Sequence, residues 1–185
     1  AGEIALKAEK TEVYTKTEVD GIVDGIEIGG RNLLRGTDWG GVNKTYYHTN
    51  KSGEGGIQFP LPSNTVVSGN EYTISMRVRG NARIVLYRIA AGGNSWLPFL
   101  YPSDLSETEF RDFSMTFTSH APELSAIYIY TAYRTTPYTE WFEIEAGSVK
   151  LEKGNKATDW TPAPEDVEAE INTIKTDVAT LTTNY

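Results

Sequence analysis

Residues 72–79 read Tyr72-Thr73-Ile74-Ser75-Met76-Arg77-Val78-Arg79, with an apolar side chain at every second position. Successive side chains of a β-strand point to opposite faces of its sheet. The alternation therefore predicts a strand with one face on a core and the other face in solvent.

Further along the chain, several short stretches have strand-like patterns. They are Arg83–Ile89, Phe113–Phe117, Ala126–Tyr130, Glu140–Ile144 and Ser148–Leu151. Turn-forming residues separate them, at Gly80-Asn81, Gly92-Gly93-Asn94, Pro102-Ser103 and His120-Ala121-Pro122. We also interpret Gly53-Glu54-Gly55-Gly56 as a hairpin turn. Short strands with no helical pattern between them predict an all-β fold, a sandwich or jelly roll, over residues 29–164.

Helical segments are expected on both sides of this β region. Residues 1–28 are polar and helix-prone, and the spacing of Val19, Ile22 and Ile26 predicts a short helix that ends near Gly29-Gly30. In residues 165–185 the apolar side chains are spaced by 4, 3, 4 and 3 positions, at Val167, Ile171, Ile174, Val178 and Leu181. That spacing is typical of the start of a coiled coil, although a helix packed on its own domain would show a similar pattern. The start at Ala1 and the interrupted pattern at Tyr185 lead us to expect a piece of a longer chain.

The net charge of −8 lies entirely in the two flanking segments. Residues 1–28 and 165–185 each carry a balance of −4, whereas the middle has 13 acidic and 13 basic residues. A neutral centre lacks the basic footprint that binding to phosphate backbones requires, so nucleic acid is not an expected partner. No apolar run approaches the roughly 20 residues of a spanning helix, and we expect no membrane partner.

The sequence holds little that catalysis needs. It has no cysteine, and its two histidines, His48 and His120, lie in polar stretches where we expect surface roles. Glu143 and Glu145 share one face of a predicted strand, roughly 6–7 Å apart, and glycosidases use such a carboxylate pair. Alternating glutamates on a solvent face are the commoner explanation. We therefore expect a non-enzymatic chain without catalytic or metal-ligating residues and without a cofactor.

Aromatic side chains stand where a core would not need them. If Ile127 and Ile129 face the core, Tyr128 and Tyr130 share the opposite face; the same alternation puts Arg83, Val85 and Tyr87 outside. Trp96 falls in the glycine-rich Gly92–Pro98 loop, and Tyr46-Tyr47 in a polar run. Flat rings pack against the C–H face of a sugar while polar groups bind its hydroxyls. The candidate saccharide-binding residues are Tyr47, Arg83, Tyr87, Trp96, Tyr128 and Tyr130. For each tyrosine, ordinary sheet packing is the alternative, and for Trp96 a place in the core.

Motifs at both ends of the β region resemble those of a known family. They are Gly30-Arg31-Asn32-Leu33-Leu34, Glu71-Tyr72-Thr73-Ile74-Ser75, Val149-Lys150-Leu151-Glu152-Lys153-Gly154 and Ala157-Thr158-Asp159-Trp160-Thr161-Pro162. They resemble jelly-roll carbohydrate-binding modules of families 4 and 9, in the version found in minor structural and baseplate proteins of phages that infect Gram-positive bacteria.

The resemblance implies a two-sheet sandwich that binds a glycan, sometimes with a structural calcium ion. It implies that Asn32, Leu33 and Leu34 lead in the first strand and that Leu151 and Trp160 close the core. It transfers no binding residue, because ligand-facing positions vary within the family.

From the residues and the resemblance together, we expect a host-adhesion module in a phage tail or baseplate. Its expected ligand is a host cell-wall or capsular saccharide, its location the virion tail, and its neighbours other tail and baseplate proteins. The coiled-coil spacing leads us to expect a homo-oligomer, with a trimer favoured. Two alternatives stay open, a structural spacer without a ligand and an accessory module of a depolymerase.

Overall fold

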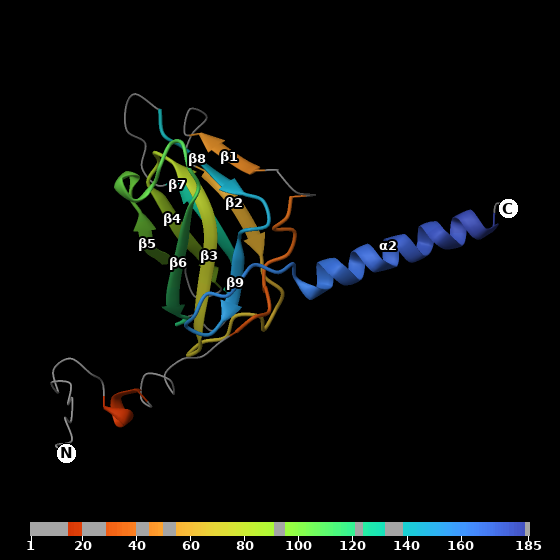
Figure 1. Cartoon of the computed structure of the whole chain (residues 1–185), viewed down its shortest axis with the longest axis horizontal. Helices are drawn as coiled ribbons and strands as arrows, with labels where there is room; N and C mark the ends of the chain where they lie inside the picture. Colours follow the sequence, from red (N-terminus) through yellow and green to blue (C-terminus); the bar gives the residue numbers. More distant parts are fainter. Residues whose placement is uncertain are drawn as a thin grey trace, which may run out of the picture.

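Two β-sheets pack face to face, and a long helix leaves them at the C-terminal end (Figure 1). The computed structural model describes residues 15–19, 29–39, 45–49, 55–90, 95–120, 124–131 and 139–183. The described strands are β1 (Thr45–Thr49), β2 (Gly55–Pro60), β3 (Glu71–Gly80), β4 (Ile84–Ala90), β5 (Ser95–Leu100), β6 (Arg111–Thr118), β7 (Leu124–Thr131), β8 (Trp141–Glu145) and β9 (Lys150–Lys153). A short 3-10 helix, η2 (Pro102–Asp104), follows β5, and the helix α2 spans Pro164–Thr183.

All strand pairs are antiparallel. The first sheet has the order β1-β8-β3-β6, and β9 also pairs with β3. Since β8 pairs with residues 78–80 of β3 and β9 with residues 72–75, these two short strands follow one another along the same neighbour. The second sheet has the order β2-β7-β4-β5.

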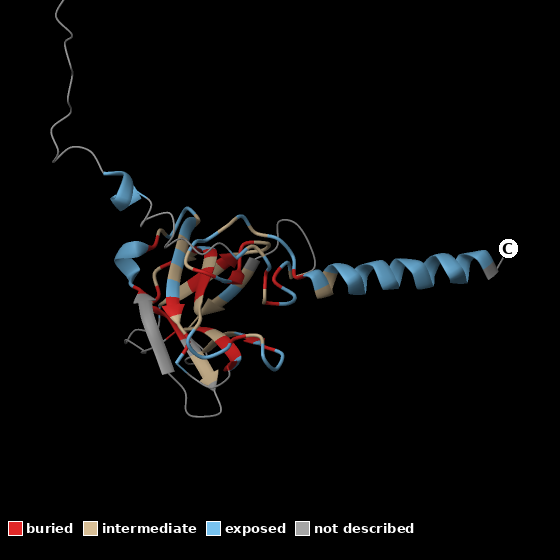
Figure 2. Cartoon of the chain, turned by 90° about the horizontal axis from the view of Figure 1, so that it is seen from below, coloured by how far each residue is buried: buried red, intermediate tan, exposed pale blue. Residues whose placement is uncertain are grey.

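The alternation that predicted a strand at residues 72–79 is confirmed in β3. Tyr72, Ile74, Met76 and Val78 are all buried and face the second sheet across the core. The second sheet contributes Ile84, Leu86, Ile127 and Ile129 to the same core. Figure 2 shows the buried positions concentrated between the sheets, as expected when two apolar faces exclude water.

Glycines expected in a turn lie within a strand. Gly55 and Gly56 are the first two residues of β2, and Gly56 lies opposite Tyr130 of β7. A Cβ atom built on Gly56 would lie 1.8 Å from the carbonyl oxygen of Ile129. The backbone of β7 therefore leaves room only for glycine at this position. The turn interpretation was wrong for Gly55 and Gly56, whereas Gly53 and Glu54 lie outside the described residues.

Trp96 lies in β5, not in a loop as its glycine-rich surroundings indicated. The strand contains Pro98, which cannot donate a backbone hydrogen bond. Within the described residues β5 pairs only with β4, so it is an edge strand, where proline is tolerated.

The opening and closing motifs meet through Asn32, which is fully buried. Its side-chain N–H groups donate to the carbonyl oxygens of Val149 and Thr161. Its side-chain oxygen accepts from the backbone N–H groups of Leu34 and Leu151. The described backbone around Asn32 is irregular and not a strand, which corrects the expectation from the resemblance.

Leu151 lies in the core as expected, but Trp160 does not. The Trp160 indole is half-buried at the edge of the sandwich, and its N–H donates to the Thr37 hydroxyl and the Val149 carbonyl oxygen. Through its hydrogen bond to Thr37, Trp160 links the segment that follows β9 to the segment that precedes β1.

Helix α2 touches the sandwich through its first turn and then extends away from it (Figures 1 and 2). Arg31 pairs with Glu165, and Asp166 accepts hydrogen bonds from Arg35 and the backbone N–H of Gly36. From residue 167 to 182 every residue is exposed. The alternative of a helix packed on its own domain is therefore wrong.

Of the N-terminal segment that we expected to be helical, the structure describes only residues 15–19. Residues 16–19 are helical, and Thr15 and Glu18 form a reciprocal cap in which each side chain accepts from the other's backbone N–H. Val19 is exposed, whereas Ile22 and Ile26 lie outside the described residues. No helix in the described part of the chain is long and apolar enough to cross a bilayer.

Candidate functional site

Tyr128 and Tyr130 form a pair of rings on the outer face of the second sheet. Their ring centroids lie 5.3 Å apart with an interplanar angle of 40°. Ile127 and Ile129, between and beside them, are fully buried in the core, and both tyrosines are half-buried. The predicted inward and outward alternation of β7 is thus confirmed.

The strand register places further predicted residues beside this pair. Trp96 of β5 lies opposite Tyr87 of β4, and Tyr87 lies opposite Tyr128 of β7. Gln58 of β2 lies opposite Tyr128 on the other side. Directly opposite residues of antiparallel strands belong to the same face of a sheet. The aromatic row, defined as Trp96, Tyr87, Tyr128 and Gln58 with Tyr130 beside it, therefore crosses all four strands.

Gln58 was missed in the sequence. It is exposed on β2, and its side-chain amide offers both hydrogen-bond donors and an acceptor next to the Tyr128 ring. A signal existed, because the polar Gln58 alternates with the apolar residues Ile57 and Phe59. It could not be used, because nothing local identified residues 55–60 as a strand of this sheet.

The surface next to Tyr130 lacks a cross-strand side chain, because its partner on β2 is Gly56. Along β4, Val85 lies opposite Tyr130 and was expected in solvent, yet it is only 1% exposed. Ala126, on the same face of β7, is also buried. Two positions of the outer face are therefore buried, and the expectation that Val85 lies in solvent was wrong.

Arg83 lies just before β4, to one side of the row. Its guanidinium carbon is 5.3 Å from the centroid of the exposed Tyr101 ring, a cation–π arrangement. Arg83 and Tyr87 are four positions apart along the extended chain, a distance of about 13 Å. Arg83 is therefore not part of the row itself.

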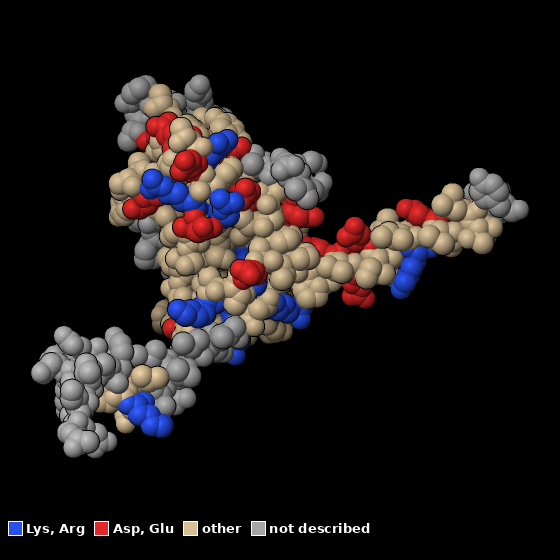
Figure 3. Space-filling model, in the orientation of Figure 1, with Lys and Arg blue, Asp and Glu red and all other residues tan. Residues whose placement is uncertain are grey.

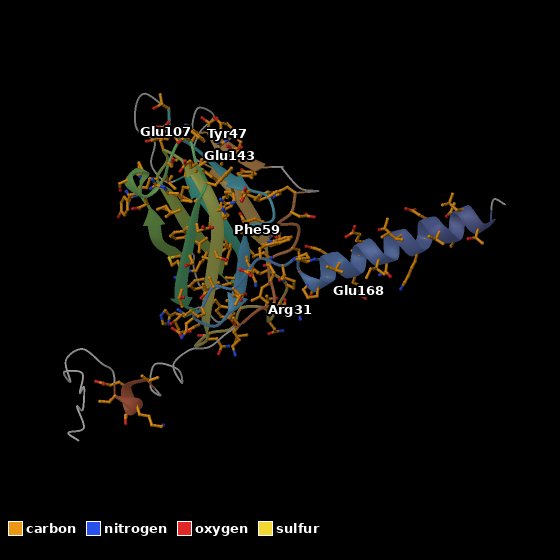
Figure 4. All side chains as sticks on the ribbon, in the orientation of Figure 1. Arg31, Tyr47, Phe59, Glu107, Glu143 and Glu168 are labelled. Atoms are coloured by element: carbon orange, nitrogen blue, oxygen red, sulfur yellow. The ribbon has the colours of Figure 1, made fainter. Side chains whose placement is uncertain are left out.

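Tyr47 does not join the other predicted residues. It lies on β1 of the first sheet, is 58% exposed, and stacks on Trp141 with ring centroids 5.9 Å apart. Figure 4 shows Tyr47 and Glu143 at the same end of the sandwich, and the two residues are paired across β1 and β8. Tyr47 was grouped with the others because a polar run says nothing about which sheet a strand joins.

Neighbours of Tyr47 in the sequence face the core. Tyr46 packs on Phe142 with ring centroids 6.0 Å apart, and burial raises the pKa of its phenol, with the nearby Tyr128 phenol as the second cause. His48 packs on the same Phe142 ring at 5.6 Å. The expected surface role of His48 was therefore wrong, whereas His120 is exposed as expected.

Glu143 and Glu145 lie on the outer face of the first sheet, and each is paired with an arginine of β3. Arg79 binds Glu143 with an N–O distance of 2.6 Å, and Arg77 binds Glu145. Figure 3 shows basic and acidic side chains intermingled on one end of the sandwich. The two carboxylates act here as anchors for arginines, which explains their alternation without any catalytic role.

The resemblance also implied a structural calcium ion, which requires a cage of oxygen ligands. Within the described ranges, no group of three or more histidine and carboxylate side chains is placed to hold a metal ion.

No protein-family model matches the sequence, and no curated protein matches it. Among solved structures, the apo form of BiXyn10A CBM1 is similar at 19% identity with a TM-score of 0.32, over 52% of this chain and 62% of that one. The CBM22-1 xylan-binding domain from Paenibacillus barcinonensis has 10% identity and a TM-score of 0.41, over 71% and 99%.

A further likeness is to the CBM22-1 and GH10 modules of a Clostridium thermocellum endo-1,4-beta-D-xylanase, complexed with xylohexaose. It has 8% identity and a TM-score of 0.37, over 74% of this chain and 30% of that one. The chain thus spans less than two thirds of the first and third of these structures. All three scores lie below 0.5, so these likenesses carry no argument about function.

Proposed function

We propose that this chain is a non-catalytic module that binds a saccharide across the outer face of its second sheet. The observation that carries the proposal is the aromatic row, which takes one residue from each of four neighbouring strands. Ordinary packing accounts for single tyrosines, but it does not require aromatic residues at directly opposite register positions on three neighbouring strands.

The dimensions of the row favour an extended ligand. Neighbouring strands lie about 4.8 Å apart, so the row from β5 to β2 is about 14 Å long. The Tyr128 and Tyr130 rings are tilted by 40° and offer two adjacent aromatic surfaces. Gln58 at the β2 end of the row, and Arg83 to one side of it just before β4, supply groups that hydrogen-bond hydroxyls. An oligosaccharide fits this arrangement better than a single sugar.

In the finer form of the proposal, the module belongs to a phage tail or baseplate protein and adheres to host cell-wall or capsular polysaccharide. Support comes from the opening and closing motifs that resemble such modules. The structure gives these motifs a framework role, because Asn32 joins them inside the protein. The proposed location is the virion tail, in contact with other tail and baseplate proteins.

Helix α2 supports the further proposal that the chain associates with copies of itself. Its apolar seam is uncovered within the described chain, with Ile174 55% and Leu181 60% exposed. β-Branched residues at both seam positions, such as Ile171 at a and Ile174 at d, favour trimers over dimers. In a parallel, in-register coil Glu170 at position g meets Lys175 at position e of the next helix, an attractive pair.

Association matters for adhesion because single saccharide sites bind weakly. Copies on one rigid assembly raise avidity by roughly 10²–10⁴ when several sites engage together. A homotrimer on parallel α2 helices therefore fits an adhesion module.

A structural spacer is the second candidate function. The burial of Val85 and Ala126 on the outer face favours it, because a spacer can cover a face that a binding module must keep open. An accessory module of a depolymerase has the same binding surface and differs only in its parent chain.

The decisive experiment measures binding to purified cell-wall polysaccharide after loss of the row. The double change Tyr128→Ala with Tyr130→Ala, and separately Trp96→Ala, should abolish binding. Tyr47→Ala is the matched control, because Tyr47 is a tyrosine on the other sheet that should not matter. Thermal unfolding identifies any variant that has lost its fold. Unchanged binding in folded variants would show that the row is not the site, whereas absence of binding by the unaltered chain would favour the spacer.

A further inference from the structure

A cavity of about 400 Å³ opens on the outer face of the first sheet, which faces away from the aromatic row. Its floor is formed by Ser75 and Arg77 of β3 and by Ser114 of β6. Its walls are the turn at residues 147–148 and the segment 157–160 that follows β9. The volume lies within the range of about 300–1,000 Å³ that is typical of small-molecule sites.

Two buried charges hold the wall of the cavity in place. Lys150 and Glu152 project from β9 on this outer face, yet they are only 1% and 0% exposed. Lys150 donates to the Thr158 hydroxyl and the Asp159 carbonyl oxygen, and Glu152 accepts from the backbone N–H and hydroxyl of Thr158. The segment 157–160 is thereby fixed across the sheet before any ligand arrives.

Several polar groups that face the cavity are not used by the protein itself. Ser75 and Ser114 lie opposite each other across β3 and β6. The hydroxyls of Ser75 and Ser114 and the carboxylate of Asp159 make no hydrogen bond or ion pair with the rest of the described chain. These three groups can bind a ligand without breaking an existing contact, because none has to release a partner.

The charge around the cavity selects against anions. Arg77 is the cation of the lining, and it is already bound by Asp112 and Glu145. The Asp159 carboxylate adds a further negative charge. Since carboxylates outnumber the cation, a phosphate or a sugar acid would be repelled, whereas a neutral molecule would not.

An aromatic ring completes the lining. Trp160 contributes to the cavity, whereas Phe113 lies opposite Met76 and packs against the core on the other face of the sheet. The Trp160 N–H is used by Thr37 and Val149, so toward the cavity the indole can offer only its ring. A ring combined with hydroxyl and carboxylate acceptors suits a molecule with both C–H faces and hydroxyl groups.

We infer that this cavity is a second binding site, for a neutral, hydroxyl-rich ligand of the size of a mono- or disaccharide. It lies on the opposite sheet from the aromatic row and uses none of its residues, so it goes beyond the function proposed above.

Amide chemical shifts of the isotope-labelled chain test the inference. Cellobiose and N-acetylglucosamine serve as neutral probes and glucuronic acid as the anionic probe. The neutral probes should shift the backbone amides of Ser75, Ser114, Gly147 and Asp159 in a saturable way, and glucuronic acid should not. Absence of saturable shifts at these amides with either neutral probe would overturn the inference.

Variants separate the cavity from the rest of the surface. Ser114→Tyr should fill the cavity and abolish the shifts, and Asp159→Asn should weaken probe binding without adding bulk. Ser68→Tyr is the matched control, because Ser68 is an exposed serine that does not line the cavity. Shifts that persist in folded Ser114→Tyr would place the probe elsewhere and contradict the inference.

The double variant at Tyr128 and Tyr130 distinguishes the two sites. If both proposals hold, it loses polysaccharide binding but keeps the shifts around Ser75 and Ser114. If the aromatic row is not a site, the cavity shifts still stand on their own.

Discussion

The side-chain oxygen of Asn32 accepts a hydrogen bond from the backbone N–H of Leu151, which is 119 residues further along the chain. The same side chain donates to two carbonyl oxygens of the closing segment, at Val149 and Thr161. A single buried amide thus joins the two ends of the sandwich.

Replacing Asn32 by Asp should therefore destabilise the fold strongly. The shape is kept, but a carboxylate oxygen would face the carbonyl oxygens of Val149 and Thr161 in place of the donor N–H. Leaving buried polar groups without partners costs about 1–3 kcal/mol each, so we expect the free energy of unfolding to fall by at least about 2 kcal/mol. Urea unfolding measures it. Asn172→Asp, on the exposed face of α2, should change it little, and equal effects at both positions would contradict the role of Asn32.

Two adjacent glycines of β2 should respond differently to alanine. At Gly56 the new Cβ meets the backbone of Ile129, which cannot move without disturbing β7. At Gly55 the nearest atom is 3.0 Å away and belongs to the His48 ring, a side chain that can shift. We expect Gly56→Ala to cost at least about 2 kcal/mol more than Gly55→Ala. Thermal and urea unfolding of the two variants give the comparison. Similar stabilities would contradict the close approach of Gly56 to the backbone of Ile129.

Association through α2 should depend on the apolar seam. Light scattering at tens of micromolar should give a mass near three times 20.5 kDa for the unaltered chain. Ile174→Asp should return the mass to that of one chain and leave the unfolding of the sandwich unchanged, because the helix is exposed there. Thr173→Asp is the control, since Thr173 lies outside the seam. A monomeric unaltered chain at this concentration would count against the trimer.

A change at Lys175 addresses the direction of the helices. Lys175→Glu places like charges at positions g and e of a parallel coil, so it should weaken association, and Glu170→Lys in the same chain should restore it. In an antiparallel pair g meets g and e meets e, so the double change would give no rescue. The midpoint of dissociation on dilution is the quantity to compare.

Stability should fall in strongly alkaline solution through Tyr46. Burial raises the pKa of its phenol in the folded chain above the ordinary value of 10.0, with Tyr128 as a second cause. Above pH 10.0 the unfolded chain therefore loses this proton first, and the folded state becomes less favoured as the pH rises. Tyr46→Phe should reduce the loss of melting temperature above that pH. Tyr47→Phe serves as the matched control, and an identical pH profile for Tyr46→Phe and the unaltered chain would refute the assignment.

The strands with the clearest signal in the sequence are those in which buried residues alternate with more exposed ones. β3 and β7 show this in Ile74 and Ser75, and in Ile129 and Tyr130, because burial on one side imposes a period of two. β2 and β5 gave no such signal. Glycines at the start of β2 and Pro98 within β5 are typical of turns, and only pairing with β7 and β4 makes strands of them.

The candidate site was predicted in part for the same reason. Alternation gives the face of a residue on its own strand, so Tyr128 and Tyr130 were grouped correctly. It does not say which strands become neighbours, and that is why Tyr47 was assigned to the wrong sheet and Gln58 was missed. The cavity on the first sheet had no local signal, because it exists only where the segment 157–160 folds back over Lys150 and Glu152.

The joint between α2 and the sandwich has a mechanical consequence. Force applied along the helix reaches the sandwich through its first turn, where Arg31 meets Glu165 and Arg35 meets Asp166. The side chains of Arg31 and Arg35 are more than half exposed, so dissolved salt screens these attractions. Concentrated salt should therefore weaken two of the contacts that hold the first turn of α2 against the sandwich, so the angle between helix and sandwich should vary more there than in dilute solution.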